Sequence, residues 1–310
     1  MIPPPGPHGG DGARLAAALG VDPMAVLDLS VSLNPLAPDV GEVVAKHVDA
    51  AGHYPDPIAA TAAVAAALAV DRGRVLLTNG GSEAIALVAA ELGGSVDEPD
   101  FSLYPRGGGP RWRSDPHNPS GRLAGPDEGT GVSVWDEAFY PLATGRWTSG
   151  RAAAVVVGSL TKVFACPGLR VGYVLGADPE LIERVRGRQP EWSVNGLAAA
   201  AVPDLLDRAD LPAWASGIAA LRVELVTVLR AAGLDPEPSD ANYVLVRAPG
   251  LRAALAPSGV LVRDCAGFGL PDHVRIAVPD ADGLSRLHTV LGALIGVEHR
   301  SARQEPEGVA

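Results

Sequence analysis

Short apolar segments alternate with helical ones through the middle of this 310-residue chain, and this alternation restricts the fold more than any other feature. Strands that alternate with helices form βαβ units, so we predict an α/β fold with a mainly parallel central sheet. Such sheets bind ligands at the carboxyl ends of their strands. Helices are expected at residues 58–69 and 82–92, and strands at residues 75–78, 132–135, 153–157 and 171–175.

A smaller α+β domain is expected after this alternating region. A long helical segment (197–232) leads to strands at residues 242–246, 260–262 and 273–278 and to a closing helix at 285–295. A further strand is expected near the start, at residues 26–31. We predict an N-terminal arm (1–45) that packs on the small domain, a large domain (46–200), the small domain (201–296) and a disordered polar tail (297–310).

Charge and cysteine content exclude several classes of protein. The net charge of −11 argues against general nucleic-acid binding, although a local arginine cluster can still hold a small anionic substrate. The Pro-rich start is not a signal peptide, and no uninterrupted apolar run approaches the length of a membrane span. Cys166 and Cys265 have no zinc-type spacing, so no metal site is predicted. We expect a reduced, cytoplasmic protein.

Lysine occurs only twice in the chain, as Lys46 and Lys162, among 25 Lys and Arg residues. A chain that uses arginine almost everywhere keeps lysine where an amine is needed, because a guanidinium neither loses its proton nor forms an imine. Lys162 follows Ser159-Leu160-Thr161 and precedes Pro167-Gly168-Leu169-Arg170-Val171-Gly172-Tyr173. This segment is typical of a lysine that binds pyridoxal phosphate as a Schiff base. An incidental lysine in a strand-to-helix turn is the alternative.

A pyridoxal phosphate enzyme also needs a carboxylate at the pyridine nitrogen of its cofactor. Asp136, at the end of the strand predicted at residues 132–135, is the candidate. A desolvated carboxylate there would keep the ring nitrogen protonated and so make the ring an electron sink. The alternative is that Asp136 caps a helix that follows the strand.

The cofactor phosphate needs a cradle of hydrogen-bond donors, which we place at Asn79-Gly80-Gly81-Ser82-Glu83. Glycines allow close approach of the backbone, and the N-terminus of a helix presents unpaired N–H groups. Ser159 and Arg170 would add a hydroxyl and a guanidinium. An ordinary helix cap is the alternative for the Gly-Gly-Ser segment.

Two further side chains are expected at the cofactor ring. Asn118, in the segment Asp115-Pro116-His117-Asn118-Pro119, could donate to the phenolic oxygen. Tyr104 could stack on the ring.

Taken together, these segments resemble the fold-type I pyridoxal phosphate-dependent enzymes of the aminotransferase class I/II family, over residues 8–278. Within that family the chain is similar to histidinol-phosphate aminotransferases and, more specifically, to the L-threonine-O-3-phosphate decarboxylases of cobalamin biosynthesis. The segments that carry the resemblance are His8-Gly9-Gly10, residues 27–36, His53-Tyr54-Pro55-Asp56-Pro57, Asp136-Glu137-Ala138-Phe139, Trp192-Ser193-Val194-Asn195 and Val262-Arg263-Asp264-Cys265.

The resemblance implies a role for each candidate residue. Lys162 binds the cofactor, Asp136 pairs with the pyridinium and Asn118 bonds the phenolic oxygen. The cofactor phosphate is held by Gly81, Ser82, Ser159 and Arg170, and by Tyr54 from the other subunit of a homodimer. Substrate contacts are implied for Arg275 to a carboxylate, for His8 and Arg263 to a phosphate, and for Asn34 and Asn195. A surface position for Arg275 and a solvated His8 are the alternatives.

The chain departs from the family pattern in two places. Position 139 is Phe, where many aminotransferases carry a tyrosine that assists the phenolic oxygen, and this slightly favours the decarboxylase branch. Between Tyr104 and Asn118 there is room for a loop but not for the helix and strands normally found there, and residues 122–131 are too short for the usual helix. We therefore expect a trimmed large domain, with a sheet edge that a partner or the Gly/Arg-rich loop must cover.

Three functions follow from this sequence. The first is decarboxylation of L-threonine O-3-phosphate, a small anionic amino acid, to aminopropanol phosphate in cobalamin biosynthesis. The second is transamination of the histidinol-phosphate kind, and the third is binding of pyridoxal phosphate without turnover. The cofactor motifs do not separate the first two, because the orientation of the bound substrate, set by His8, Arg263 and Arg275, decides which bond breaks.

Overall fold

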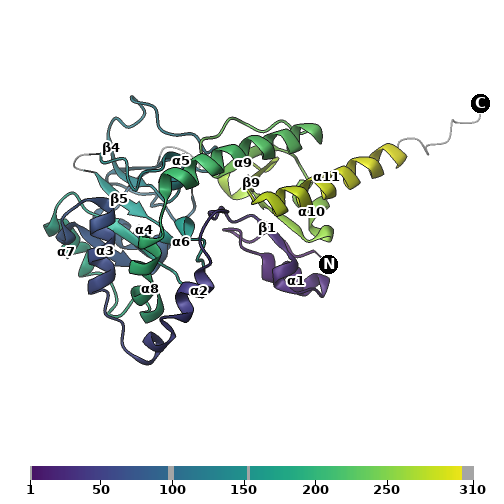
Figure 1. Cartoon of the computed structure of the whole chain (residues 1–310). Coiled ribbons are helices and arrows are strands. Elements are labelled where there is room, and N and C mark those ends of the chain that lie inside the picture. The colour runs from purple at the N-terminus through teal and green to yellow at the C-terminus, as the bar shows by residue number, and fades with distance from the viewer. Residues whose placement is uncertain (1, 97–100, 152–153, 302–310) are drawn as a thin grey trace, which may run out of the picture. The chain divides into compact units, whose positions relative to one another are not determined.

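The computed structural model describes residues 2–96, 101–151 and 154–301, which form two compact units (Figure 1). The first unit consists of the residues up to Ser32, Ala220–Pro238 and the residues from Tyr243 onward. The second unit consists of Leu33–Ala219 and Ser239–Asn242. It therefore extends at both ends beyond residues 46–200, the bounds expected for the large domain.

The second unit is built on a five-stranded sheet with the spatial order β2-β6-β5-β4-β3. Its strands are β2 (Val75–Thr78), β3 (Arg111–Ser114), β4 (Val132–Asp136), β5 (Val155–Gly158) and β6 (Gly172–Leu175). β6 is antiparallel to both β2 and β5, whereas β3, β4 and β5 are parallel to one another. All strands except β6 therefore point the same way, which confirms the predicted mainly parallel sheet.

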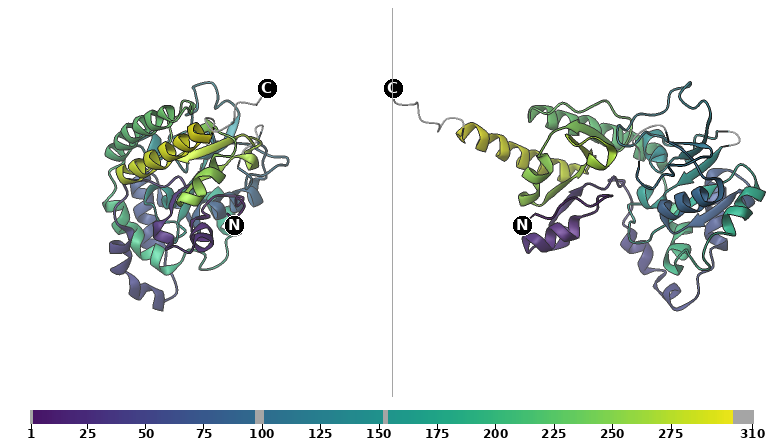
Figure 2. Two further views of the ribbon diagram at one scale, coloured as in Figure 1. Left: turned by 90° about the vertical axis from the view of Figure 1, so that its right-hand side faces the viewer. Right: turned by 180° about the vertical axis from the view of Figure 1, so that it is seen from behind.

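Helices pack against both faces of this sheet (Figure 2). They are α2 (Val40–Ala45), α3 (Ile58–Leu68), α4 (Gly80–Leu92), α5 (Tyr140–Thr144), α6 (Leu160–Val163), α7 (Pro179–Arg186), α8 (Gly196–Asp207) and the first part of α9 (Leu211–Ala231). Successive residues of a strand point to opposite faces of a sheet. Val75 and Leu77 accordingly pack in a core with α3 and α8, and Leu76 packs in a core with α4 and α7.

The shortened stretch between Tyr104 and Asn118 contains a strand, so the expectation of a loop alone is wrong for Arg111–Ser114. This segment is β3, and it pairs in parallel with β4. Trp112 and Ser114 are buried while the arginines beside them are half-buried, an alternation that is typical of an edge strand. On its other side, the backbone of Trp112 donates to the carbonyl of Ser95, so residues before the Gly/Arg-rich loop cover the start of the edge.

The first unit contains a four-stranded sheet with the order β1-β8-β9-β7. Its elements are α1 (Gly12–Leu19), β1 (Leu27–Leu29), β7 (Tyr243–Arg247), α10 (Leu251–Leu255), β8 (Val260–Asp264), β9 (His273–Ala277) and α11 (Ala281–Ser301). β1 runs parallel to β8, and β9 is antiparallel to both β8 and β7. The residues near the N-terminus thus contribute a strand to the sheet formed by the C-terminal residues.

The two longest described helices, α9 and α11, have 21 residues each. α9 is, among the described helices, the one that is long and apolar enough to span a membrane by length and composition. Its Trp214 and Ile218 belong to the core of the second unit, and its Leu225 and Leu229 to that of the first. α11 continues to Ser301, beyond the expected end at residue 295, and residues 302–310 of the predicted tail lie outside the described residues.

Candidate active site

Lys162 lies in α6, one turn of helix that follows the carboxyl end of β5. Leu160 and Val163 are buried in the core beneath this turn, and the Thr161 hydroxyl donates to the carbonyl of Val171 at 3.2 Å. These contacts hold the turn in place, while Lys162 itself is only half-buried. Its Nζ lies 5.8 Å from the centre of the Phe139 ring. The predicted Schiff-base lysine therefore stands at the ligand-binding end of a parallel strand.

Asp136 ends the neighbouring strand β4 and accepts two hydrogen bonds. Tyr104 donates its hydroxyl to Oδ2 at 2.6 Å, and the backbone N–H of Ala138 donates to Oδ1 at 2.9 Å. Burial raises the pKa of Asp136, and the two hydrogen bonds and the charge of Lys162 oppose that rise. Since α5 begins later and has Phe139 as its N-cap, the alternative that Asp136 caps this helix is wrong.

The predicted phosphate cradle forms the N-terminus of α4, which begins at Gly80, two residues earlier than expected. Gly80 has a φ of +76°, and a Cβ there would lie 2.5 Å from Nη2 of Arg170. A Cβ on Gly81 would lie 3.7 Å from the side chain of Ser159. Glycine at position 80 is thus required for the guanidinium and the helix N-terminus to come this close, whereas a Cβ at position 81 would make an ordinary contact. The side chain of the N-cap residue, Asn79, makes no capping hydrogen bond, and its backbone N–H donates to the Glu83 carboxylate at 2.7 Å, so the phosphate role of this segment stays a prediction.

These groups fit a phosphorylated pyridine cofactor. Backbone N–H groups at a helix N-terminus, a hydroxyl and a guanidinium are donors for a phosphate. Ser82 is exposed in the first turn of α4, and Arg170 is exposed beside Gly80. Lys162 and Asp136 add the amine and the carboxylate that such a ring requires.

Tyr104 and Asn118 are both buried. The Tyr104 ring lies 6.0 Å from that of Trp112 and 5.7 Å from that of Phe101. Asn118 donates its backbone N–H to the Ser114 hydroxyl at 3.0 Å, and Ser114 is the register partner of Asp136. Both residues are therefore tied to the segment that carries Asp136, and stacking of Tyr104 on the cofactor stays a prediction.

The side chains of Asn34 and Asn195 donate hydrogen bonds to backbone carbonyl groups near Lys162 and Arg170. Asn34 donates from Nδ2 to the carbonyl of Val163 at 2.9 Å. Asn195 donates to the carbonyl of Leu169 at 2.6 Å and caps α8 by accepting the N–H of Ala198. These contacts support the two turns that carry Lys162 and Arg170, and a substrate contact for either asparagine stays a prediction.

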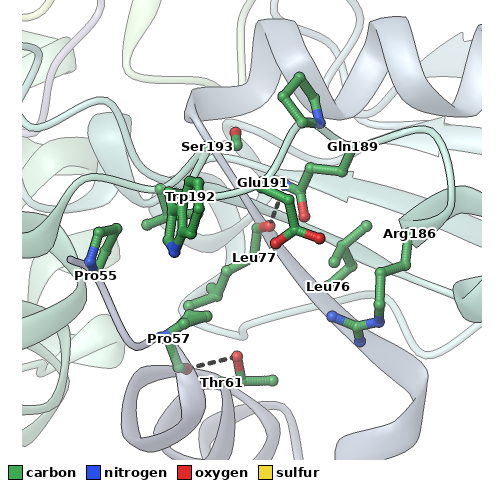
Figure 3. Close-up of a pocket in the computed structure, with 12 residues that line it drawn as sticks. Pro55, Pro57, Thr61, Leu76, Leu77, Arg186, Gln189, Glu191, Trp192 and Ser193 are labelled. Atoms are coloured by element: carbon green, nitrogen blue, oxygen red, sulfur yellow. Dashed lines mark hydrogen bonds between the residues drawn. The ribbon is translucent and has the colours of Figure 1, made fainter.

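Tyr54 is 79% exposed, and its ring lies 4.7 Å from that of Trp192. Trp192 and the prolines that follow Tyr54 line a pocket of about 250 Å³ (Figure 3). Lys162 and Asp136 are not among its lining residues. This pocket is therefore separate from the cofactor groups described above.

Glu83 is a residue whose role the sequence did not reveal. Its carboxylate accepts the backbone N–H of Asn79 at 2.7 Å, the Gln189 amide at 3.1 Å and the Ser193 hydroxyl at 2.5 Å. It thereby joins the phosphate cradle to the segment that precedes Asn195. A glutamate in the first turn of a predicted helix was the only local signal of such a role.

A buried ion-pair cluster beside Asp136 was also missed. Arg151 binds Oδ2 of Asp115 at 2.6 Å and Oε1 of Glu137 at 3.1 Å, and its guanidinium lies 3.6 Å from the centre of the Trp135 ring. Burial raises the pKa of Glu137, and hydrogen bonds from Ser149 and Thr148 oppose this rise. The residues are far apart in sequence, so no local pattern identifies them. Among the described residues, no group of three or more His, Cys, Asp or Glu side chains could hold a metal ion.

The candidate substrate residues of the first unit are His8, Arg263 and Arg275. Arg275 is 6% exposed, so the alternative of a surface arginine is wrong. It lies opposite Arg263 in the register of β8 and β9, and Arg263 is 5% exposed. His8 is exposed, which agrees with the alternative of a solvated side chain. Partial loss of water around its ring and the charge of Arg263 lower its pKa.

The sequence model of the family "aminotransferase class I and II" matches residues 114–291. Histidinol-phosphate aminotransferase 2 of Methylococcus capsulatus is 29% identical over 87% of this chain and 90% of that protein. Threonine-phosphate decarboxylase of Salmonella typhimurium is 28% identical over 92% of this chain and 95% of that protein.

Solved structures show the same fold. Histidinol-phosphate aminotransferase from Sinorhizobium meliloti, in complex with pyridoxal-5'-phosphate, superposes with a TM-score of 0.78 at 16% identity and covers 96% of each chain. L-threonine-O-3-phosphate decarboxylase from Porphyromonas gingivalis has a TM-score of 0.74 at 22% identity, over 87% of this chain and 100% of that one. The chain therefore belongs to the aminotransferase class I and II family, which confirms the predicted fold and makes it an enzyme with pyridoxal 5'-phosphate as its cofactor.

Proposed function

We propose that the chain is an aminotransferase of the histidinol-phosphate kind, which moves an amino group between a phosphorylated amine and a keto acid. The similarity to the Methylococcus capsulatus enzyme over most of both chains supports this reading. A histidinol-phosphate aminotransferase from Clostridium acetobutylicum also shares the fold, with a TM-score of 0.76. The observation that carries the proposal is a pair of buried arginines.

Arg263 and Arg275 are directly opposite each other on antiparallel strands, so their side chains share one face of the sheet. Burial and the charge of Arg275 lower the pKa of Arg263 to about 10. Two buried like charges are costly unless an anion neutralises them. A substrate pair that brings a phosphate and a carboxylate would do so, with Arg275 taking the carboxylate and Arg263 and His8 taking the phosphate.

The residues of the second unit would hold and tune the cofactor. Pyridoxal phosphate supplies an electron sink for charge that develops at the substrate carbon. Lys162 provides the amine that links it and can carry a proton at that carbon. Asp136, oriented by Tyr104, holds the proton on the ring nitrogen. Gly80, Gly81, Ser159 and Arg170 bind the phosphate, and Asn118 donates to the phenolic oxygen.

Decarboxylation of L-threonine O-3-phosphate is the second candidate, and Phe139 favours it. The Lys162 amine faces the Phe139 ring, at a position where many aminotransferases carry a tyrosine that assists the phenolic oxygen. The relative from Salmonella typhimurium is named for this reaction. A place in cobalamin biosynthesis and a cytoplasmic location accompany this candidate as predictions.

We further propose that the active unit is a homodimer in which Tyr54 acts across the interface. The exposed aromatic pair of Tyr54 and Trp192 supports this, because two large rings left in water favour a protein contact. Equilibrium sedimentation tests whether the protein is a dimer. A monomeric variant that binds the cofactor as tightly as the wild-type dimer would contradict the role of Tyr54 across the interface.

The two reactions are separated by their products. Protein loaded with pyridoxal phosphate is incubated with histidinol phosphate and 2-oxoglutarate, and separately with L-threonine O-3-phosphate, while glutamate and carbon dioxide are measured. Glutamate formed from the first mixture supports transamination. Carbon dioxide released from the second without glutamate formation overturns it in favour of decarboxylation.

Lys46 offers a matched control for Lys162, because it is the other lysine of the chain and is exposed after α2. Lys162→Ala should abolish product formation and the absorbance band of the bound cofactor, whereas Lys46→Ala should leave both unchanged. A band that depends on Lys162, without turnover of either substrate, would replace both proposals by a protein that binds pyridoxal phosphate without turnover.

A further inference from the structure

The N-terminal arm from Pro3 to Gly12 is held on the first unit by side chains of that unit. Arg263 donates to the carbonyl oxygens of Gly6 at 3.3 Å and Pro7 at 2.5 Å. Farther along the arm, the N–H of Gly10 donates to the Ser30 hydroxyl at 2.9 Å. The arm thus lies on Arg263, one of the two proposed anion-binding arginines.

Arg252 contacts the same arm on both sides of Gly6 and Pro7, the residues that Arg263 binds. It donates from Nη1 to the carbonyl of Pro3 at 3.1 Å, and its Nη2 lies 3.8 Å from Oδ2 of Asp11. Arg252 and Asp11 are 8% and 7% exposed, so their attraction is only weakly screened by water. Asp11 in turn accepts the N–H of Gly6 at 2.7 Å.

His8 lies in the arm between Pro3 and Asp11, the two residues that Arg252 contacts. Its neighbour Pro7 is bonded to Arg263, and a Cβ on its other neighbour, Gly9, would lie 3.4 Å from Nη1 of Arg263. The φ of Gly9 is +76°, and the same Cβ would lie 2.8 Å from the carbonyl of Ser30. The arm therefore passes Arg263 in one tight conformation, and the position of His8 depends on how the flanking residues are held.

We infer that Arg252 is a positioning residue for phosphate recognition: with Asp11 it holds the arm so that His8 stays beside Arg263. The inference rests on the proposed function in assigning His8 and Arg263 to the substrate phosphate. Arg252 itself does not touch the substrate. It determines specificity through the arm, because a loose arm would withdraw His8 from the phosphate and leave the amine chemistry at Lys162 intact.

The test compares Arg252→Gln with Arg286→Gln in the full-length protein loaded with cofactor. Arg286 is the matched control, since it also binds backbone carbonyls of the first unit, those of Ala25, Ser258 and Gly259, but none in the arm. Hydrogen exchange of the Gly6 amide reports whether the arm is attached. Calorimetric titration with inorganic phosphate reports phosphate binding without any turnover.

In Arg252→Gln we expect faster exchange at Gly6 and phosphate binding weakened about tenfold, the loss of one charge-assisted contact. The KM for histidinol phosphate should rise by a similar factor with kcat nearly unchanged, while the KM for unphosphorylated histidinol should not move. Arg252→Lys, which keeps the charge near Asp11, should recover part of the phosphate affinity. Arg286→Gln should resemble the wild type in all four measurements.

Two results would overturn the inference. If the Gly6 amide stays protected in Arg252→Gln, Arg252 does not anchor the arm. If the arm is released but phosphate binding is unchanged, the arm has no part in recognition. Failure of the proposed function is distinguishable, because wild-type protein that binds no phosphate at all would refute the assignment of Arg263 and His8, whatever the exchange data show for Arg252.

Discussion

The Tyr104 hydroxyl donates a hydrogen bond of 2.6 Å to Oδ2 of Asp136, although the two residues are 32 positions apart. The contact connects the shortened region of the chain to the carboxylate expected at the pyridine nitrogen. It stabilises the charged form of Asp136, against the burial that raises its pKa. Trimming of this region has therefore left intact a group that orients Asp136.

Removal of this hydroxyl should weaken the cofactor site without unfolding the protein. Tyr104→Phe keeps the ring against Trp112 but loses one hydrogen bond to a charged group, about 1.5 kcal/mol, so kcat should fall about tenfold. Tyr173→Phe is a control, because this buried tyrosine donates to the backbone carbonyl of Trp147, at 3.5 Å. Equal loss of kcat in both variants would contradict a specific role for Tyr104.

Replacement of Asp136 should raise stability and remove activity together. The folded-state pKa of Asp136 lies above its ordinary value of 3.8, so the folded protein holds this proton more tightly than the unfolded chain. Stability from this group is therefore present below the ordinary pKa and is lost as pH rises through the raised pKa.

In protein without cofactor, Asp136→Asn should thus be more stable than the wild type at pH 7. Its free energy of unfolding should also lack the decrease with rising pH that ionisation of Asp136 causes in the wild type. Its kcat should fall about 100-fold once the cofactor is added, because the ring nitrogen loses its carboxylate. Urea unfolding at several pH values makes the measurement. Parallel curves of unfolding free energy against pH for both proteins would refute the assignment.

An added methyl group at Gly80 should displace Arg170 from the phosphate cradle. In Gly80→Ala the new Cβ would meet Nη2 of Arg170 at 2.5 Å, so the dissociation constant of pyridoxal phosphate should rise at least about tenfold. Gly233→Ala is the matched control, since Gly233 has the same φ of +76° but nothing within 4 Å of its Cβ position. Both variants share the cost of a left-handed alanine, about 1 kcal/mol, and only Gly80→Ala should lose cofactor.

Loss of Arg151 should destabilise the protein strongly. Arg151→Gln leaves the carboxylates of Glu137 and Asp115, 0% and 2% exposed, without their cation, and the free energy of unfolding should fall by about 3 kcal/mol. Arg247→Gln breaks an ion pair whose side chains are 67% and 51% exposed, and should cost less than about 1 kcal/mol. Denaturant unfolding compares the two, and similar losses would show that the Arg151 cluster is not a structural anchor.

Much of the fold could be predicted from short stretches of sequence. The short apolar runs of β2 and β5 and the glycines at the start of α4 are local signals, because apolar composition and backbone freedom depend on neighbouring residues alone. β3 was missed because only four residues, Arg111–Ser114, form it inside a Gly- and Pro-rich stretch. Its strand conformation depends on pairing with β4, which no local pattern reports.

The sequence by itself determined the identities and chain order of the chemical groups: a glycine-rich helix start, then an aspartate at the end of a buried strand, then one lysine after the next strand. Only the tertiary structure decided which groups meet. The hydrogen bond of Tyr104 to Asp136, the grip of Arg151 on Asp115 and Glu137, and the pairing of Arg263 with Arg275 all join residues distant in sequence. Their geometry depends on strand register and burial, which arise from packing of the whole chain rather than from any one segment.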